Sequence, residues 1–224
     1  MNGRLPPVIA IDGPSASGKG TIAEIVAQRL GFHYLDSGAL YRIVGLVGGE
    51  RGANLDSDPE ISSISLNLNI KFENGQVWVD GRDVSGRIRG EVAGAAASRV
   101  AALPGVRAAL MTLQRGFRQP PGLVADGRDM GSVVFPDAAT KIYLTATAEE
   151  RARRRYKQFM EKGSGASMAA LLQDIRDRDF RDSTRAAAPL LKCADAIEID
   201  TTGMPVEEVV ARVLQQYQQS QKPQ

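Results

Sequence analysis

The feature that most constrains this chain is a glycine-rich loop between a short apolar run and a helical pattern. Residues 8–11 are apolar and lead into Asp12, as in a buried parallel strand, and the loop at 13–21 follows with the sequence GPSASGKGT. From residue 19 to 30, apolar side chains recur at helical spacing, and Gly31 ends the predicted helix. A strand, a glycine loop and a helix in this order predict the first unit of an α/β fold.

The loop has the composition of a phosphate-binding site. A chain of phosphates needs several backbone N–H groups aimed at one point, and glycine lets the backbone curl that closely. The following helix N-terminus adds partial positive charge, and Lys19 would reach the terminal phosphates as a mobile cation. The alternative is a glycine-rich turn that binds nothing, which the flanking strand and helix disfavour. The candidate phosphate-binding residues are Gly13, Pro14, Ser15, Ala16, Ser17, Gly18, Lys19, Gly20 and Thr21.

One position of the loop departs from the commonest pattern, and it bears on where a metal would bind. Most phosphate-loop NTPases carry Ser or Thr directly after the lysine, whereas here Gly20 stands there and Thr21 follows it. Asp126 follows a second buried strand at 123–125, and an acidic residue at that edge of a sheet can hold the water shell of Mg²⁺. Thr21 and Asp126 are therefore the candidate Mg²⁺ residues, acting through water. The alternative for Asp126 is a turn-forming aspartate.

Further apolar runs extend the predicted parallel sheet. Residues 141–144 and 196–199 are the third and fourth expected strands. Thr147 and Glu150 form a capping box that opens one helix, Ser167 caps the next, and Pro205 opens a last helix toward residue 217. The polar tail from residue 218 is expected to fray.

A different pattern interrupts the α/β part. Side chains at 66, 68, 70 and 72 alternate between apolar and polar neighbours, Asn74-Gly75 suits a hairpin turn, and Val77 and Val79 alternate after it. These features predict a small antiparallel sheet, followed by alanine-rich helices at about 91–102 and 105–118. The predicted fold class is therefore α/β: a parallel sheet flanked by helices, with an inserted αβ subdomain.

Composition excludes several classes of protein. The 224 residues allow one large domain, and a net charge of +2 is too balanced for a protein that coats nucleic acid or a membrane surface. The single cysteine and single histidine exclude an internal disulfide, an all-cysteine zinc site and a histidine-based metal cage. No apolar run approaches the length of a membrane helix. We therefore expect a cytoplasmic protein that binds no nucleic acid and no membrane. We also expect a monomer, since nothing in the sequence demands an oligomer.

Charged pairs outside the loop suggest recognition of an anionic ligand. Arg128 and Asp129 follow the strand at 123–125, at its ligand-facing edge. On a helix, Arg178, Asp182 and Arg185 would share one face, although for such a run taken alone mutual ion pairing on a solvated helix is the favoured explanation. Arg151, Arg154 and Arg155 also share a helical face. Near the N-terminus, Ser37 is as suited to capping a helix as to contacting a ligand, and that helix would carry Tyr41 and Arg42.

At this point the chain resembles one family. The segments GPSASGKGT, LDSGALYR, DVSGRIR, ADGRDMGSVVFPDA and RDFRDSTRAAAPL, in this order and over nearly the whole chain, are similar to bacterial cytidylate kinases of the long-insert type, within the nucleoside monophosphate kinases. The resemblance implies transfer of the γ-phosphoryl group of ATP to CMP or dCMP, with Mg²⁺ as cofactor. It implies a P-loop kinase fold whose core comprises about 1–37, 105–156 and 186–224, with a monophosphate-binding subdomain at about 38–104 and a helical lid at about 157–185.

The resemblance also assigns roles to individual residues. Residues 13–21 match the ATP phosphate cradle. The residues that match the CMP site are Ser37, Tyr41, Arg42, Ser98, Arg107, Arg128, Asp129, Arg178 and Asp182. Within that set, Ser98, Arg107 and Asp129 would read cytosine, and Arg178 and Asp182 would contact the ribose. The catalytic residues would be Lys19, Arg128, Arg178 and Arg185.

Two alternatives stay open. A related kinase could act on another monophosphate or on a small hydroxyl compound. A GTP-dependent switch is the alternative from another class, but it predicts an Asn-Lys-x-Asp element that reads guanine, and the sequence contains none. A substrate panel separates these possibilities.

Overall fold

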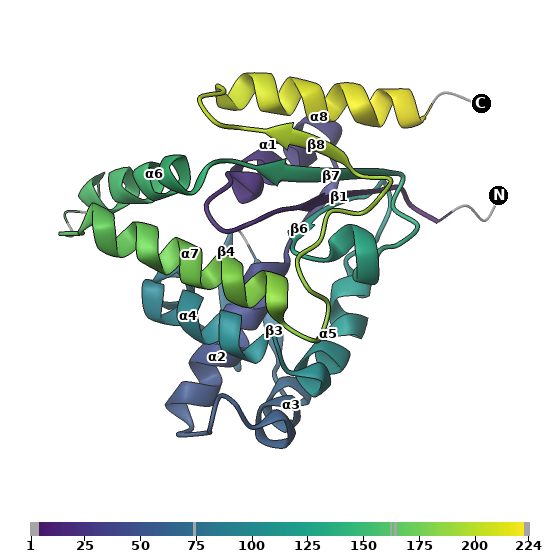
Figure 1. The fold of residues 1–224 in the computed structure, drawn as a ribbon. Coiled ribbons are helices and arrows are strands. Elements are labelled where there is room, and N and C mark those ends of the chain that lie inside the picture. The colour runs from purple at the N-terminus through teal and green to yellow at the C-terminus, as the bar shows by residue number, and fades with distance from the viewer. Residues whose placement is uncertain (1–4, 74, 162, 164, 222–224) are drawn as a thin grey trace. The chain divides into compact units, whose positions relative to one another are not determined.

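The computed structural model describes residues 5–73, 75–161, 163 and 165–221. These residues form two compact units, one from the chain up to Leu35 together with the chain from Phe117, and the other Asp36–Gly116 (Figure 1). No helix among the described residues combines the length and apolar character that a membrane span requires.

The first unit is built on a parallel sheet. Its strands are β1 (Val8–Asp12), β2 (His33–Asp36), β6 (Leu123–Gly127), β7 (Thr140–Thr145) and β8 (Ile197–Asp200), in the order β2-β6-β1-β7-β8. Strand β1 is central and pairs in parallel with β6 on one side and β7 on the other. The predicted strands at 8–11, 123–125, 141–144 and 196–199 are thus confirmed. Strand β2 was not predicted, because it is only four residues long, lies at the sheet edge and buries only Leu35.

Two helices cover one face of this sheet. They are α1 (Lys19–Leu30) and α8 (Val206–Ser220), which lie side by side in Figure 1. Ile22 and Val26 of α1 and Val209 and Val213 of α8 are buried in one cluster with the side chains of β1, β6, β7 and β8. Helix α8 continues through Ser220, so the fraying expected from residue 218 is wrong for the described part of the tail.

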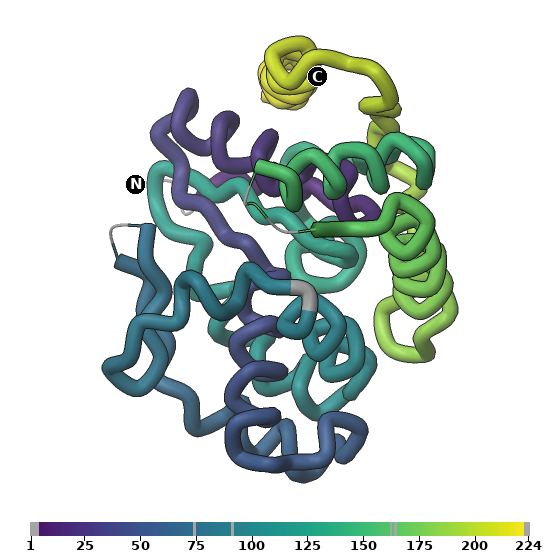
Figure 2. Tube along the Cα trace, turned by 90° about the vertical axis from the view of Figure 1, so that its left-hand side faces the viewer, coloured from purple at the N-terminus to yellow at the C-terminus, as the bar shows by residue number. Residues whose placement is uncertain are grey.

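The other helices of this unit form a hairpin. Helix α6 (Ala148–Glu161) and helix α7 (Met168–Thr184) lie against each other, as Figure 2 shows, around a small cluster of their own in which Ala152, Leu171 and Ile175 are buried. Thr147 Oγ1 accepts from the backbone N of Glu150 at 3.2 Å, so Thr147 caps α6 as predicted. The reciprocal half of the predicted capping box is not formed, because the backbone N of Thr147 donates to Thr202 Oγ1 and the Glu150 carboxylate bonds to Arg153 and Arg154. Ser167 caps α7 as predicted. Between β6 and β7 a short π-helix, η2, spans Met130–Val134.

The second unit combines helices with an antiparallel sheet. Its helices are α2 (Ser37–Glu50), α3 (Asp58–Leu66), η1 (Arg87–Arg89), α4 (Glu91–Val100) and α5 (Pro104–Gly116), and its strands are β3 (Ile70–Glu73), β4 (Gln76–Val79) and β5 (Arg82–Asp83). The strands pair in the order β3-β4-β5, and Val77, Val79 and Val84 pack against Ile43 and Val47 of α2.

The predicted pattern of this unit is correct in its second half and wrong at its start. Strands β3 and β4 and helices α4 and α5 lie where they were expected, although Asn74 of the predicted turn is outside the described residues. Leu66 was expected to begin a strand but ends helix α3, which starts behind Ser57 with Pro59 in its first turn. The apolar alternation from residue 66 to 72 therefore covers the last residue of a helix and the first residues of a strand. Helix α5 belongs to this unit, whereas the expected division placed residues 105–116 in the core; the functional division into core, subdomain and lid stays a prediction.

Candidate active site

The glycine loop has the backbone conformation that its sequence predicts. It joins β1 to α1, and Gly13 and Gly18 have φ of 157° and 91°. A Cβ at Gly13 would lie 2.1 Å from the carbonyl oxygen of Leu144, so the close approach of the loop to β7 requires glycine. Ala16 also has a positive φ, 58°, which an alanine rarely adopts.

Several polar atoms of the loop are placed to receive an anion. Lys19 Nζ donates to the carbonyl oxygen of Pro14 at 3.0 Å, so the side chain folds back over the loop. The hydroxyl oxygens of Ser15 and Ser17 are buried and find no hydrogen-bond partner within the described part of the chain. Buried hydroxyls in native proteins are ordinarily bonded, and a phosphate oxygen would supply partners for these two.

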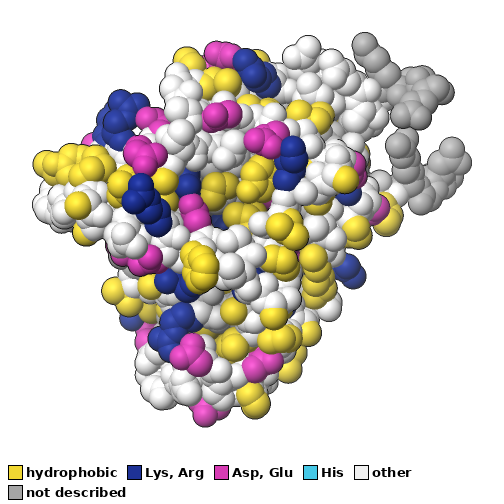
Figure 3. Space-filling model, viewed as in Figure 1, with side chains coloured by type: hydrophobic (Ala, Val, Ile, Leu, Met, Phe, Trp, Pro, Cys, Tyr) yellow, Lys and Arg dark blue, Asp and Glu magenta, His cyan; other side chains and the backbone are white. Residues whose placement is uncertain are grey.

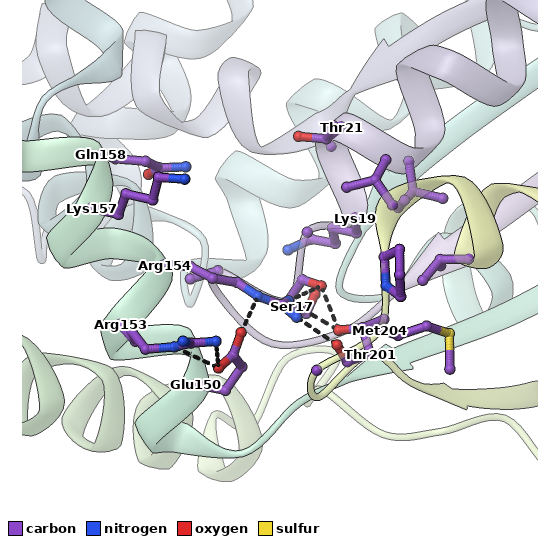
Figure 4. A pocket seen from close by; sticks show the side chains of 18 of the residues that line it. Ser17, Lys19, Thr21, Glu150, Arg153, Arg154, Lys157, Gln158, Thr201 and Met204 are labelled. Carbon is purple, nitrogen blue, oxygen red and sulfur yellow. Dashed lines mark hydrogen bonds and ion pairs between the residues drawn. The ribbon is translucent and has the colours of Figure 1, made fainter. Parts of the chain in front are cut away.

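A cavity of about 650 Å³ opens beside the loop (Figure 4). Such a volume lies in the range of small-molecule sites. One part of its lining is basic, with Lys19, Arg153, Arg154 and Lys157, and another is apolar, with residues 204–206. A polyanion joined to a flat apolar group, as in a nucleoside triphosphate, matches both parts.

Asp126, near the end of β6, lies beside the loop. Asp126 accepts at Oδ2 from the Tyr34 hydroxyl at 3.3 Å, and a Cβ at Gly20 would lie 3.2 Å from the same oxygen. Thr21 is exposed on the first turn of α1 and lines the cavity (Figure 4). Glycine at position 20 therefore lets α1 approach Asp126, where serine or threonine would crowd it.

The oxygen donors beside the loop suit Mg²⁺ as a metal held through water. Mg²⁺ prefers oxygen ligands and retains several waters, so one carboxylate near the phosphates is sufficient protein contribution. Asp126 would supply that carboxylate, and the described residues contain no cluster of three or more His, Cys, Asp or Glu side chains that would bind a metal directly.

Asp12, which the sequence analysis treated only as the end of a strand, is a buried structural carboxylate. It accepts at Oδ1 from the backbone N of Met130 and at Oδ2 from the backbone N of Gly131, both at 2.8 Å. Burial raises the pKa of Asp12 from its ordinary 3.8 to about 6, against the lowering effect of these two N–H groups and Lys19 and with a smaller raising effect of Asp129. These contacts hold η2 and hence the position of the preceding Asp129.

The structure brings together the charged residues that follow β6 and those of α7. Arg128 Nε lies 2.8 Å from Asp182 Oδ2, and Arg185 Nη2 lies 3.9 Å from Asp129 Oδ1, with all four side chains largely buried. Burial alone would raise the pKa of Asp182, but the charge and hydrogen bond of Arg128, with smaller effects of Arg178 and Arg185, hold it below its ordinary value. The expected solvated helix face is therefore wrong for Asp182, which is buried and is hydrogen-bonded to Arg128 from another element.

Over the α6–α7 hairpin the remaining charges are mixed. Figure 3 shows basic and acidic side chains interspersed there on the visible face. The pairs include Arg176 with Glu149 and Arg153 with Glu150.

The second unit holds the other predicted residues. Asp36 caps helix α2, since its Oδ1 accepts from the backbone N of Ala39 at 3.0 Å, so a capping role for Ser37 is wrong. Ser37 is the first residue of α2 and is buried. Arg42, on the same helix, donates from Nη1 to the carbonyl oxygen of Ile88 at 3.0 Å, which ties α2 to η1.

Arg107 of α5 is a buried cation in this unit. Its Nη1 lies 3.3 Å from the Tyr41 hydroxyl and its guanidinium lies 5.9 Å from the centre of the Tyr41 ring. Ser98 is buried on α4, which packs closely on α2: a Cβ at Gly45 of α2 would lie 2.7 Å from the Cβ of Ala96. The structure therefore groups Arg107 with Tyr41, and the assignment of these residues to CMP stays a prediction.

Comparison with known proteins bears on the family. The family model for cytidylate kinase matches residues 9–219. A cytidylate kinase of Nitrosomonas europaea is 54% identical over 222 residues, which cover 99% of this chain and 100% of that protein. A cytidylate kinase of Chromobacterium violaceum is also 54% identical, with 96% of this chain and 97% of that protein covered. Among solved structures, a gluconokinase of Sinorhizobium meliloti superimposes with a TM-score of 0.49 at 15% identity, over 96% of this chain and 94% of that one.

The family match includes the glycine loop, the whole cavity lining and the paired charges Arg128 and Asp182 described above. The relatives match almost from end to end, so the agreement is not confined to a common loop. This chain therefore belongs to the cytidylate kinase family.

Proposed function

We propose that this protein transfers the γ-phosphoryl group of ATP to CMP or dCMP, giving ADP and CDP or dCDP. The observation that carries the proposal is the family match over residues 9–219, which spans the phosphate loop and the paired charges Arg128–Asp182 together. The cavity beside the loop, with its basic and apolar parts, supports ATP as the donor.

The loop would hold the phosphates of ATP. Backbone N–H groups of the loop, which every residue from 13 to 21 except Pro14 possesses, would face the phosphate oxygens. Lys19 would leave the Pro14 carbonyl oxygen to neutralise charge on the migrating group. Phosphoryl transfer needs no covalent enzyme intermediate, so positioning and charge neutralisation provide the catalysis. Arg128, Arg178 and Arg185 would neutralise the equatorial oxygens.

Mg²⁺ would accompany ATP. When bound, it would supply positive charge that offsets the negative charge of the phosphates. Asp126, oriented by the Tyr34 hydroxyl, and Thr21 would hold its waters. The side chain that Gly20 lacks leaves room for that arrangement.

Asp129 would select cytosine. Cytosine carries an amine at position 4 where uracil carries a carbonyl, so a carboxylate accepts a hydrogen bond from cytosine and repels uracil. Ser98 and Arg107 would complete the recognition of the base, and Arg178 and Asp182 would bind the ribose. Ser37, Tyr41 and Arg42 would bind the monophosphate.

A lid movement would complete the site. The predicted lid at about 157–185 carries Arg178, Asp182 and Arg185, and it overlaps the α6–α7 hairpin, whose small core is separate from that of the sheet. Closing it over the substrates would gather the arginines and exclude water, which suppresses hydrolysis of ATP.

A substrate panel tests the proposal. ADP release is measured by a coupled assay with ATP, Mg²⁺ and each of CMP, dCMP, UMP, AMP and dTMP. We expect CMP and dCMP to give the largest kcat/KM. A strong preference for AMP or dTMP would assign the protein to another monophosphate, and tight GTP binding without CMP-dependent turnover would indicate a switch.

A further inference from the structure

Two arginines of α6 contact the backbone of the phosphate loop. Arg151 donates from Nη1 to the carbonyl oxygen of Ser15 at 3.2 Å, and Arg154 donates from Nη1 to the carbonyl oxygen of Ser17 at 3.2 Å. The two arginines are three residues apart on one helix, and the two carbonyls are two residues apart in the loop. Helix α6, which lies more than 130 residues further along the chain, thus contacts the loop backbone at two nearby points.

The residue between the two carbonyls is the one with unfavourable backbone geometry. Ala16 has φ of 58°, in the left-handed region that disfavours residues with a side chain. Such a conformation persists only where its surroundings hold it. Hydrogen bonds from charged donors to the carbonyl oxygens of Ser15 and Ser17, the residues on either side of Ala16, provide that hold.

Arg151 is itself held rigidly. Only 6% of its side chain is exposed, its Nε donates to the carbonyl oxygen of Ala146 at 3.0 Å, and its two terminal nitrogens lie 2.9 and 2.6 Å from the two oxygens of Asp179. Asp179 belongs to α7, next to Arg178. A bidentate pair of this kind fixes the guanidinium plane, so the direction of the bond to Ser15 is fixed as well.

Arg154 is fixed by different partners. Its Nε donates to Glu150 at 3.1 Å, and its terminal nitrogens donate to the hydroxyl and carbonyl oxygens of Thr201, at 3.0 and 2.5 Å (Figure 4). Thr201 is buried and donates from its own hydroxyl to the carbonyl oxygen of Ser17 at 3.1 Å. Arg154 lines the cavity, whereas Arg151 does not.

We propose that Arg151 and Arg154 are positioning residues that keep the phosphate loop in its phosphate-binding conformation, with Asp179 orienting Arg151. The proposal rests on the proposed function only in taking ATP as the ligand of the loop. It links the shape of the loop to helix α7, because the same guanidinium contacts Ser15 and Asp179. Arg151 is the residue to test, since it lies outside the cavity lining.

The test compares Arg151→Met with a matched control, Arg176→Met. Arg176 also joins the two helices, through Glu149 at 3.1 Å, but contacts no part of the loop. ATP binding is measured by calorimetry without CMP, and the exchange rates of the loop amides, at Gly13 and at residues 15–19, are measured by hydrogen–deuterium exchange. For Arg151→Met we expect ATP affinity to fall about tenfold and the loop amides to exchange faster, since hydrogen bonds from a charged group are lost. Arg176→Met should match the wild type in both.

Further variants separate positioning from a general loss of stability. Asp179→Asn removes the charge that orients Arg151, so it should raise the KM for ATP with little change in the KM for CMP. In a protein that already carries Arg151→Met, the same substitution should raise the KM for ATP little further. Arg151→Lys keeps the charge but cannot bond to Ala146, Ser15 and Asp179 at once, so it should restore affinity only in part. Should Arg151→Met not fold, Arg151→Lys and Asp179→Asn carry the same test.

The outcomes are decisive. The proposal is overturned if the Arg151 and Asp179 variants bind ATP and exchange their loop amides as Arg176→Met does, or if the KM values for ATP and CMP rise equally. Failure of the proposed function is a different result: an acceptor other than CMP would leave ATP binding and loop exchange as expected here. A wild-type protein that binds no ATP would reject the proposed function, and the exchange comparison would still test the loop contacts.

Discussion

Lys19 is the residue whose change tests the chemistry most directly. Its Nζ lies on the Pro14 carbonyl oxygen, a contact that phosphate oxygens would replace. We expect Lys19→Ala to lower kcat by about 100-fold or more, because charge neutralisation in the transition state is lost. Lys192→Ala is the control, since Lys192 is exposed and pairs with Glu198 away from the cavity. An unchanged kcat for Lys19→Ala would exclude the role.

Asp129 tests the choice of base. It is buried and faces Arg185 at 3.9 Å, so its carboxylate is held in place rather than free to turn. Asp129→Ala should reduce the ratio of kcat/KM for CMP over UMP by about tenfold or more, because the acceptor for the cytosine amine is gone. The KM for ATP should change little. If the CMP-to-UMP ratio survives intact, the assignment of Asp129 to cytosine is wrong.

Asp12 makes stability depend on pH. Its folded-state pKa, about 6, is above the ordinary 3.8, so the folded protein binds this proton more tightly than the unfolded chain. The stabilisation from the protonated form is complete below about pH 4 and is lost as the pH rises through 6. The free energy of unfolding of the wild type and of Asp12→Asn is measured by urea unfolding at several pH values. Between pH 4 and 7 the wild type should lose stability relative to Asp12→Asn, because only the wild type has this carboxyl group to ionise. A difference that does not vary with pH contradicts the raised pKa.

At the scale of elements, the α6–α7 hairpin should be able to loosen by itself. Ile175 is buried in the hairpin cluster, which shares no residue with the cluster between the sheet, α1 and α8. Ile175→Ala removes about 2–5 kcal/mol of local packing. We expect faster amide exchange in α6 and α7, a lower kcat because Arg178 and Asp182 lie on α7, and little change in exchange of the sheet.

The comparison for that prediction is a residue of the sheet core. Val213 of α8 is fully buried against the sheet. Val213→Ala should lower the unfolding temperature, and it should not speed amide exchange in the hairpin more than in the sheet. Equal effects of the two substitutions on the sheet would mean that the hairpin has no independent stability.

At the scale of the whole molecule, the residues assigned to CMP are divided between the two units. Asp129 and Asp182 belong to the first, and Ser98 and Arg107 belong to the second. CMP should therefore slow amide exchange in segments of both units, about 128–131 and 178–185 in one and 37–42 and 98–107 in the other. ATP alone should protect the loop at 13–21 in the first unit. Protection by CMP confined to one unit would refute the assignment.

Local patterns predicted the parts of the fold that depend on neighbouring residues. The strand, glycine loop and helix at the N-terminus follow from short-range rules, as do the caps at Thr147 and Ser167, and the structure confirms them. Helix α3 was missed because alternation in residues 66–72 resembles a strand although Leu66 lies in a helix. Strand β2 was missed because pairing at a sheet edge, rather than its own composition, makes it a strand.

The sequence by itself determined that a phosphate loop would form, because glycines at 13 and 18 can adopt conformations that other residues avoid, and it indicated the family through motifs in order. Only the tertiary structure decided which charges meet. Asp182 pairs with Arg128, 54 residues away, and Arg151 reaches Ser15 across 136 residues. No local pattern gives such partners, because they depend on how strands and helices pack. Burial then decides what each charge does, so Asp12 and Arg151 are buried structural residues, a role that their local sequence did not indicate.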